Sequence, residues 1–366
     1  MQRRIKIIIS GGGTGGHIFP ALAIANALKE MNRDNEILFV GALGKMEMEK
    51  IPAAGYNIIG LNIRGLQRKI SVSNLLFPFR LAGSIWKSKE IIRDFKPDAA
   101  VGVGGYASGP LLWAASSSGI PCLIQEQNSF PGITNRMLAK RVRKICVAYE
   151  GMNKFFPDDK IIITGNPVRK DITQLLGKKE EAIKFFGLDR NRKTLLVLGG
   201  SLGARTINES IDAGIKEISS SGIQILWQTG KGFYEKAKAS AGEPVKVFDF
   251  INRMDLAYSA ADVVVSRAGA LSVSEICISG KPVIFVPSPN VTADHQTSNA
   301  RALTERNAAL LVHDEEAQEK LVDEAIHLMS NEEKCAELSE NILAFAKKDA
   351  AEKIAELIYE LTGTND

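Results

Sequence analysis

Short runs of isoleucine, valine and leucine alternate along the chain with longer segments of helical apolar periodicity. The short runs predict buried β-strands, and the longer segments, such as 21–31 and 206–219, predict amphipathic helices. The first series of expected strands is Ile5–Ile9, Glu36–Val40, Ala99–Val103, Pro121–Gln125 and Ile145–Ala148. After residue 160 the alternation restarts with Ile161–Thr164, Thr194–Leu198, Ile223–Gln228, Val245–Phe248, Val263–Ser266, Val283–Val286 and Ala309–Val312. Strand-then-helix alternation predicts parallel sheets, so the expected fold class is α/β with two doubly wound domains.

A chain of 366 residues is long enough for two domains, and the break between them is expected near Gly165-Asn166-Pro167. We expect an N-terminal domain over residues 1–164, a C-terminal domain over 165–345 and a last segment over 346–366. The composition, with 45% hydrophobic and 24% charged residues, is that of a soluble globular protein. The apolar run at the start stops at a glycine run and is too short for a secretory leader or a membrane span. A cytoplasmic protein is therefore expected.

Charge and metal-binding residue types narrow the expected partners. Residues 1–165 carry 22 Lys and Arg against 12 Asp and Glu, whereas the remaining residues carry 24 against 30. The basic first half favours an anionic partner there, and charge alone does not decide between nucleic acid, phospholipid and a phosphorylated substrate. The cysteines and histidines are scattered, without a Cys-x-x-Cys pair or a zinc-ligand spacing. We therefore expect reduced thiols and no metal site.

Two glycine-rich segments occupy equivalent places in the two series. The strand at 5–9 runs into Gly11–Gly16, the strand at 194–198 runs into Gly199–Ala204, and a helical pattern follows each. Backbone N–H groups at such a helix N-terminus favour an anion, and glycines let a phosphate approach closely. For each loop taken alone, glycines that serve only strand–helix packing are the alternative.

The first loop has the dinucleotide spacing G-x-G-x-x-G, formed by Gly11, Gly13 and Gly16. Binding of NAD or FAD also requires an acidic residue at the end of the second strand, where it holds the ribose. That strand ends Phe39-Val40-Gly41-Ala42, without a carboxylate, which disfavours a dehydrogenase. Neither loop ends in Gly-Lys-Ser/Thr, which disfavours a P-loop nucleotidase. His17 follows the loop at the carboxyl end of a strand and is a candidate general base, with a purely structural histidine as the alternative.

A second cluster of candidate ligands follows the strand at 263–266. Gly269 opens a turn, and Ala270–Ser274 would form the first turn of a helix whose N–H groups suit a diphosphate. Glu275 is placed to accept hydrogen bonds from ribose hydroxyls, although acidic residues near a helix N-terminus also stabilise the helix itself. Gln296 offers both a donor and an acceptor, which suits sugar hydroxyls.

Seven segments of the chain match, in order, the signatures of a known family. They are Gly12–Pro20, Gly104–Pro110, Glu126-Gln127-Asn128, Gly165–Arg169, Gly199–Ala204, Ser266–Glu275 and Asp294-His295-Gln296. On these segments the chain resembles the MurG family of bacterial N-acetylglucosaminyltransferases, in glycosyltransferase family 28, over nearly its whole length. The resemblance implies a GT-B fold, in which two Rossmann-like domains face a deep cleft. It also implies inverting transfer of N-acetylglucosamine from its UDP conjugate to the 4-hydroxyl of undecaprenyl-diphospho-N-acetylmuramoyl-pentapeptide (lipid I), giving lipid II for peptidoglycan.

The resemblance also implies roles for individual residues. The residues implied to bind the donor are Thr14, Gly15, Gly16, Asn128, Arg169, Ser201, Ile251, Ala270, Leu271, Ser272, Val273, Ser274, Glu275 and Gln296. The first three of them are implied to line the cleft on its acceptor side. Among the others, Ser201 and the turn 270–274 contact the diphosphate, Glu275 the ribose, Ile251 the uracil through its backbone, and Gln296 and Asn128 the sugar. The last segment is implied to return to the N-terminal domain. The chain departs from the family at Gln125, where His is common, and at Leu202, where Gln is common.

An inverting transfer needs a base for the acceptor hydroxyl, and His17 is the best-placed candidate. The leaving UDP would be stabilised by helix N-termini and by Arg169. No Asp-x-Asp motif lies near the donor loops, so neither a metal nor another cofactor is expected.

A lipid-linked acceptor requires contact with a membrane surface. Residues 64–96 hold eight basic and two acidic residues, interleaved with apolar ones. The expected docking patch consists of Leu75, Leu76, Phe77, Phe79, Arg80, Trp86 and Lys87. Apolar groups ringed by cations suit anionic lipid, so we expect a peripheral protein on the cytoplasmic face of the plasma membrane, with no nucleic-acid partner. An ordinary amphipathic surface helix is the alternative.

Two other functions stay open at this point. One is a different GT-B enzyme acting on UDP-N-acetylglucosamine, such as a non-hydrolysing 2-epimerase, which would carry further acid and base residues around the sugar. The other is a nonenzymatic nucleotide-sugar sensor or membrane scaffold, which would keep the donor loops without needing His17.

Overall fold

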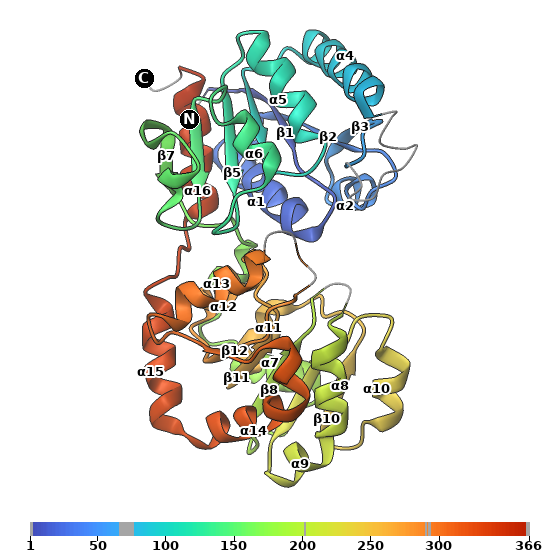
Figure 1. Ribbon diagram of the computed structural model, residues 1–366, viewed down its shortest axis with the longest axis vertical. Helices are drawn as coiled ribbons and strands as arrows, with labels where there is room; N and C mark the ends of the chain where they lie inside the picture. Colours follow the sequence, from blue (N-terminus) through green and yellow to red (C-terminus); the bar gives the residue numbers. More distant parts are fainter. Residues whose placement is uncertain (1–2, 66–76, 201–202, 290, 292–293, 364–366) are drawn as a thin grey trace. The chain divides into compact units, whose positions relative to one another are not determined.

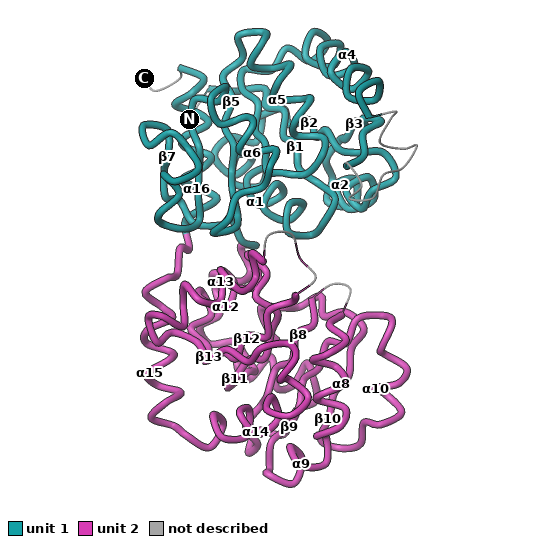
Figure 2. The backbone as a smooth tube through the Cα atoms, in the orientation of Figure 1, with its two compact units in different colours: residues 1–169, 349–366 teal, residues 170–348 magenta. Residues whose placement is uncertain are grey.

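Two parallel β-sheets, each flanked by helices, make up the computed structural model, which describes residues 3–65, 77–200, 203–289, 291 and 294–363. The chain divides into one unit of Met1–Arg169 with Asp349–Asp366 and a second unit of Lys170–Lys348 (Figure 2). The predicted α/β class with two doubly wound domains is therefore confirmed.

The first unit contains a seven-stranded sheet in the order β3-β2-β1-β4-β5-β6-β7 (Figure 1). Its strands are β1 (Lys6–Ser10), β2 (Glu36–Ala42), β3 (Asn57–Leu61), β4 (Ala99–Gly102), β5 (Cys122–Glu126), β6 (Lys144–Val147) and β7 (Ile161–Ile163). Its helices are α1 (Gly15–Met31), α2 (Glu47–Ala53), α4 (Phe77–Phe95), α5 (Ser108–Ser117), α6 (Ile133–Leu138) and α16 (Ala350–Leu361). Ile7 and Ile9 of β1 belong to the core under α1 and α16, whereas Ile8 belongs to the core under α4 and α5. Because both faces are covered, β1 reads as a continuous apolar run.

The strand order of this sheet reverses at β1. The neighbours of β1 are β2 on one side and β4 on the other, with Ile8 opposite both Leu38 and Ala100. At such a switch point the loops that leave the carboxyl ends of β1 and β4 lie beside each other, and doubly wound folds bind ligands there. The topology therefore places the first glycine loop next to the segment that follows β4.

The last helix, α16, packs against α1 in the first unit (Figure 1). A buried polar cluster fixes it there: Asn35 Nδ2 donates to Tyr359 Oη at 2.8 Å and to the Leu28 carbonyl at 2.7 Å. The Ile5 N–H donates to Asn35 Oδ1 at 3.0 Å. The end of the chain is thus hydrogen-bonded, through one asparagine, to the start of the first strand.

The second unit contains a six-stranded parallel sheet in the order β10-β9-β8-β11-β12-β13, which reverses at β8 in the same way. Its strands are β8 (Thr194–Leu198), β9 (Gln224–Gln228), β10 (Val245–Phe248), β11 (Val263–Ser266), β12 (Val283–Phe285) and β13 (Leu310–Leu311). Its helices are α7 (Lys179–Phe186), α8 (Arg205–Ala213), α9 (Ile215–Ser220), α10 (Tyr234–Ser240), α11 (Met254–Ala260), α12 (Ala270–Ser279), α13 (His295–Thr304), α14 (Ala317–Ser330) and α15 (Glu332–Leu343). The loops after β8 and β11 are therefore neighbours, as are those after β1 and β4 in the first unit.

Three sequence predictions need correction. The strand β3 is not predicted, because it lies at the sheet edge and only Leu61 in it is fully buried, which weakens the apolar pattern. Ile161–Ile163 pairs with β6 in the first sheet and does not begin the second series. The single helix expected at 206–219 is broken at Gly214, where a Cβ would lie 2.5 Å from Val322 of α14.

Among the described residues, no helix has the length and hydrophobicity needed to cross a bilayer.

Candidate active site

The loops that follow β1 and β4 meet backbone to backbone. Gly105 has a φ of +89°, and a Cβ on it would lie 2.5 Å from the carbonyl oxygen of Gly12. Gly104 has a φ of +96°, and a Cβ on it would lie 2.7 Å from His17 Nε2. Only glycine combines this backbone conformation with so close an approach. The segment after β4 therefore seats both the first glycine loop and the ring of His17.

His17 lies in the first turn of α1, for which Thr14 is the N-cap residue. Its Nδ1 is 3.0 Å from the Gly12 carbonyl oxygen and 3.5 Å from Thr14 Oγ1. A carbonyl oxygen can only accept, so the bond to Gly12 puts the hydrogen on Nδ1 and the lone pair of the neutral ring on Nε2. The structure thus groups His17 with Thr14, Gly15 and Gly16 and makes Nε2 the basic atom.

A buried carboxylate completes this loop and is not predicted from the sequence. Glu47, the first residue of α2, is 1% exposed. Its Oε2 accepts the N–H of Gly13 at 2.8 Å, and its Oε1 accepts the N–H of Ala42 at 3.0 Å. The carboxyl end of the second strand lacks an acidic residue, but the side chain of Glu47 lies beside that end and binds the Ala42 N–H. Because the Glu47 carboxylate binds the Gly13 N–H, this amide does not serve as a phosphate ligand. A dinucleotide such as NAD is therefore disfavoured at this loop, as it is from the sequence.

The loop after β5 is organised by Glu126. Its carboxylate accepts the backbone N–H of Asn128 at 3.0 Å and Asn135 Nδ2 at 2.8 Å. These bonds hold Asn128 at the same carboxyl edge of the sheet as His17. Gln125, where the family commonly has His, is buried and donates to Asn166 Oδ1 at 2.9 Å. In this chain, position 125 therefore links two of the signature segments.

Arg169, the last residue of the first unit's N-terminal stretch, stacks on the first signature. Its guanidinium carbon lies 5.8 Å from the centre of the Phe19 ring, within the range of a cation–π contact. A Cβ on Gly15 would lie 3.1 Å from the same ring, so Gly15 gives Phe19 its room. The structure thus brings Arg169 together with the His17 loop.

In the second unit, α12 begins directly after the loop that leaves β11. Its N-cap, Gly269, has no side chain to cap the helix, so the N–H groups of Leu271 and Ser272 point toward the carboxyl edge of the sheet. The positive end of the helix dipole lies at the same place. Glu275, further along the helix, accepts a hydrogen bond from Tyr258 Oη at 3.2 Å, which orients its carboxylate.

Gln228, at the end of β9, connects two of the expected donor-binding segments and is not predicted from the sequence. Its Nε2 donates to the Gly200 carbonyl at 3.1 Å, and its Oε1 accepts the Ile251 N–H at 2.9 Å. The N–H of Ile251 therefore has its partner within the protein. Ser201 and Leu202 lie outside the described residues. The available signal for Gln228 is an amide side chain at the end of a strand whose middle residues, 225–227, are apolar.

Gln296 lies in α13, and hydrogen bonds tie this helix to two donor loops. Its Oε1 accepts the Ser288 N–H at 2.9 Å, which fixes the loop after β12. Asn299, also in α13, is buried and donates to the Ala268 carbonyl in the loop before α12 at 3.2 Å. The structure therefore places Gln296 and the start of α12 in one hydrogen-bonded region.

A largely buried ion pair, also missed from the sequence, supports the same region. Arg267, in the loop after β11, pairs with Asp314 and donates to the Val286 carbonyl at 2.9 Å. Asp314 in turn accepts Thr206 Oγ1 at 2.9 Å. The pair joins the ends of β11 and β12 to α8, the helix that follows the second glycine loop.

Two large apolar side chains of α4 are exposed to solvent. Phe79 is 76% exposed and Trp86 is 71% exposed, and their spacing puts them on the same face of the helix. Phe77 and Arg80 are partly exposed, and Lys87 is exposed. The other two expected patch residues, Leu75 and Leu76, lie outside the described residues. The described part of the patch is thus apolar surface with cations beside it.

The aromatic and basic surface continues onto α5, which packs against α4. Lys89 Nζ lies 5.7 Å from the centre of the Trp113 ring, and the guanidinium of Arg141 lies 5.5 Å from it. Trp113 and Arg141 are not part of the predicted patch, because they lie outside the basic segment 64–96. The packing of α5 on α4 brings Trp113 beside the segment, and Arg141, which follows α6, stacks on the same ring.

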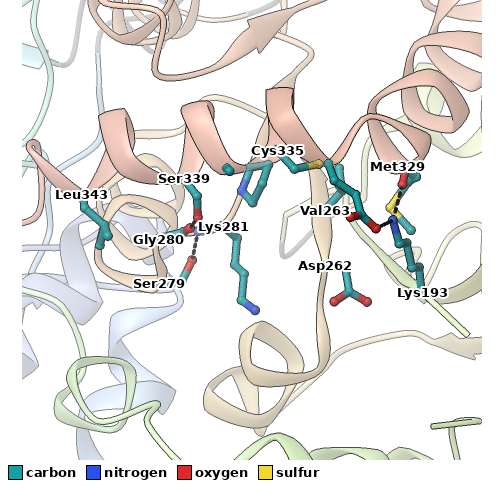
Figure 3. A pocket seen from close by; sticks show the side chains of 13 residues that line it. Lys193, Asp262, Val263, Ser279, Gly280, Lys281, Met329, Cys335, Ser339 and Leu343 are labelled. Atoms are coloured by element: carbon teal, nitrogen blue, oxygen red, sulfur yellow. Dashed lines mark hydrogen bonds and ion pairs between the residues drawn. The ribbon is translucent and has the colours of Figure 1, made fainter. Parts of the chain in front are cut away.

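A cavity of about 520 Å³ lies at the amino edge of the second sheet (Figure 3). Its lining includes Lys193, Asp262 and Lys281, and the first two directly precede β8 and β11. Burial lowers the pKa of Lys281. Because the expected donor ligands follow the carboxyl ends of the strands, none of them lines this cavity.

Nowhere in the described part of the chain do three or more His, Cys, Asp or Glu side chains gather to hold a metal ion.

Comparison with known families gives matches in both units. The glycosyltransferase family 28 N-terminal domain matches residues 7–147, and the glycosyltransferase family 28 C-terminal domain matches residues 194–354. Both glycine loops and all of the described site residues except those at 165–169 fall within these ranges.

Similar proteins match along the whole chain. A protein of Cytophaga hutchinsonii is 58% identical over 100% of this chain and 99% of its own length, and one of Parabacteroides distasonis is 56% identical over 98% and 99%. Each is named UDP-N-acetylglucosamine–N-acetylmuramyl-(pentapeptide) pyrophosphoryl-undecaprenol N-acetylglucosamine transferase. The crystal structure of Acinetobacter baumannii MurG is similar, with a TM-score of 0.79 and 27% identity over 98% of this chain and 100% of that one.

Proposed function

The chain belongs to glycosyltransferase family 28, and we propose that it catalyses the reaction for which its relatives are named. It transfers N-acetylglucosamine from UDP-N-acetylglucosamine to undecaprenyl-diphospho-N-acetylmuramoyl-pentapeptide, which is lipid I, and so makes lipid II for peptidoglycan. Identity above 50% over the full length of two such transferases carries this assignment. The same finding removes the 2-epimerase and the nonenzymatic sensor as competing functions.

His17 is proposed as the general base. Its Nε2 lone pair takes the proton of the acceptor 4-hydroxyl while the hydroxyl oxygen bonds to C1 of N-acetylglucosamine. The bond from C1 to the β-phosphate oxygen of UDP breaks in the same step, and its electron pair leaves with UDP. Attack opposite the leaving group inverts the anomeric centre. The observation that supports this role is the Nδ1–Gly12 bond of 3.0 Å, because it places the lone pair on Nε2.

The second unit is proposed to bind the donor. The N–H groups at the start of α12 and the loop of Ser201 bind the diphosphate, whose charge the helix dipole stabilises as UDP leaves. Glu275, oriented by Tyr258, binds the ribose hydroxyls, and the Ile251 carbonyl accepts the uracil N–H. In the first unit, Thr14, Gly15 and Gly16 serve the acceptor side.

The sugar and the developing charge have their own proposed ligands. Gln296 and Asn128 bind the hydroxyls of N-acetylglucosamine through their amide groups, which supply donors and acceptors. Arg169 adds a positive charge beside the leaving diphosphate. The reaction is proposed to need neither a metal nor another cofactor, and no nucleic acid takes part.

The role of His17 as general base is tested by measuring the turnover of the His17→Ala variant with labelled UDP-N-acetylglucosamine and a lipid I analogue. Turnover is expected to fall about 10²- to 10⁴-fold while donor affinity is retained, which is the usual contribution of a general base. His327→Ala is the matched control, because that histidine is exposed on α14. Near-normal formation of the disaccharide by His17→Ala would remove His17 from the mechanism.

The face of α4 is proposed to bind the cytoplasmic surface of the plasma membrane, where the polyprenyl chain of the acceptor lies. The exposed rings of Phe79 and Trp86 enter the interface, and Arg80 and Lys87 attract anionic headgroups. The exposure of two large aromatic side chains on one helix face, with basic residues beside them, supports this proposal.

Replacing both rings, Phe79→Ser with Trp86→Ser, should weaken sedimentation with phosphatidylglycerol vesicles by at least about tenfold. Leu176→Ser is the control, because Leu176 is 100% exposed but lies in the second unit. Binding that is equal for neutral and anionic vesicles, or equal for the double variant and the control, would contradict a docking role for α4.

A further inference from the structure

A single peptide group, the one between Gly12 and Gly13, is hydrogen-bonded on both of its sides. Its N–H, which belongs to Gly13, donates to Glu47 Oε2 at 2.8 Å. Its carbonyl, which belongs to Gly12, accepts from His17 Nδ1 at 3.0 Å. We propose that Glu47 is a positioning residue for the transfer reaction, acting on His17 through this peptide group.

The protein is built to keep Glu47 in this place. A Cβ on Gly12 would lie 2.2 Å from the carboxyl carbon of Glu47, and a Cβ on Gly41 would lie 2.6 Å from its Cγ. Two glycines therefore make room for the side chain, and the Ala42 N–H binds its second oxygen at 3.0 Å. With both oxygens bonded to backbone N–H groups and the side chain 1% exposed, the carboxylate has one orientation.

The physical effect follows from the resonance of the amide. A negative charge that accepts from the N–H of a peptide draws the hydrogen toward itself and increases the electron density on the carbonyl oxygen. That oxygen then accepts more strongly from the Nδ1–H of His17. This hydrogen bond fixes the orientation of the ring and favours the tautomer with the hydrogen on Nδ1 and the lone pair on Nε2. In a Ser-His-Asp triad a carboxylate does the same by direct contact with the histidine.

The same charge offsets a cost that arises during the reaction. When His17 takes the proton of the acceptor, it becomes an imidazolium in the first turn of α1. The positive end of the helix dipole disfavours a cation there. Glu47 adds a negative charge on the other side of the Gly12–Gly13 peptide, so it stabilises the imidazolium that the transition state creates.

The proposal rests on the proposed role of His17 as base, and its test separates the two. The variant is Glu47→Gln, which keeps the shape, removes the charge and replaces one of the two acceptor oxygens by an N–H₂ donor, so that one of the two backbone hydrogen bonds is lost. Glu49→Gln is the matched control, because Glu49 lies in the same helix, loses the same charge and is exposed. The turnover number of Glu47→Gln should fall roughly tenfold, the scale of one lost charge-assisted hydrogen bond, with KM for UDP-N-acetylglucosamine unchanged. Glu49→Gln should match the wild type.

The second readout does not depend on activity. In ¹⁵N NMR spectra of the full chain, His17 should show a protonated Nδ1 and an unprotonated Nε2 in the wild type and in Glu49→Gln. In Glu47→Gln the two nitrogens should shift toward the average of mixed tautomers. A carboxylate that only stabilises the fold would lower the melting temperature and leave this spectrum unchanged.

The outcomes are distinct. If His17→Ala is inactive while Glu47→Gln has wild-type turnover and a wild-type His17 spectrum, the Glu47 proposal is overturned and the base stands. If His17→Ala retains turnover but the spectrum of Glu47→Gln changes, the base assignment fails and the link from Glu47 to His17 stands without a catalytic role.

Should Glu47→Gln fail to fold, Gly12→Ala tests the same link while retaining Glu47. Its Cβ would displace the carboxylate, and Gly12 is not among the glycines with a positive φ, so alanine suits its backbone. The same loss of turnover and the same change in the His17 spectrum are expected. Wild-type turnover and tautomer in Gly12→Ala would overturn the proposal.

Discussion

Substitution of Gly105 by alanine should damage both stability and catalysis, because this residue touches the backbone that holds His17. With its φ of +89°, Gly105 has a conformation that costs an L-residue about 1–2 kcal/mol. The new Cβ would lie 2.5 Å from the Gly12 carbonyl oxygen and 3.0 Å from the Gly12 nitrogen. These are backbone atoms that cannot rotate away, so relieving the contact adds about 1–3 kcal/mol. The free energy of unfolding should fall by about 2–5 kcal/mol in total.

Gly119→Ala separates the two costs. Gly119 has a φ of +78°, but a Cβ on it would meet nothing within 4 Å. Its substitution should therefore cost only the backbone strain of about 1–2 kcal/mol. It follows α5, at the amino side of β5, and should leave turnover unchanged. Urea denaturation of the two variants measures the difference.

The catalytic effect of Gly105→Ala follows from the displacement of Gly12. A shift of its carbonyl away from His17 Nδ1 misplaces the base, and misplacement by about 1 Å costs on the order of a hundredfold in rate. Turnover of folded Gly105→Ala, measured with labelled donor and a lipid I analogue, should therefore fall between about tenfold and a hundredfold. Equal stability and equal turnover in the two alanine variants would refute the reasoning, because the close contact would then carry no cost.

Two further predictions concern stability. Tyr359→Phe removes the hydroxyl that bonds Asn35 and should lower the free energy of unfolding by about 1–2 kcal/mol in urea titrations; an unchanged midpoint would show that this cluster does not hold α16. The Arg253 guanidinium beside Asp255 holds the pKa of that buried carboxyl well below its usual range. Because the folded pKa is depressed, the ionised carboxylate stabilises the fold above pH 4 and loses this effect as the pH falls through the folded value. Asp255→Asn should therefore be less stable than the wild type by about 2 kcal/mol at pH 7, with the gap closing below pH 4 in melts; a gap independent of pH would contradict this.

The strands and the glycine loops were predictable because their signals are local. A parallel strand covered on both faces, such as β8, is a run of apolar residues, and its expected bounds at Thr194–Leu198 agree with the structure. Each glycine loop directly follows such a strand and directly precedes a helix, so it could be placed from consecutive residues. The edge strand β3 could not be recognised, because partial burial removes the alternation on which the prediction depends.

The supporting side chains of the site were not predictable, because they come from distant parts of the sequence. Glu47, Gln228 and Arg267 act on loops that follow other strands. Nothing in the residues near Glu47 distinguishes it from the exposed Glu49, since the difference lies in the space left by Gly12 and Gly41. Burial of a carboxylate is decided by its neighbours in space.

The sequence by itself determined the α/β class, most strands of the two series and the place of each glycine loop, and it made His17 a candidate base, because helix and strand periodicity and loop composition are properties of consecutive residues. The tertiary structure decided which atoms of these segments meet. It put the β4 loop against Gly12, set the tautomer of His17 through a carbonyl and placed Glu47 behind the same peptide. These contacts depend on strand order and on gaps of a few ångströms, which no local pattern encodes.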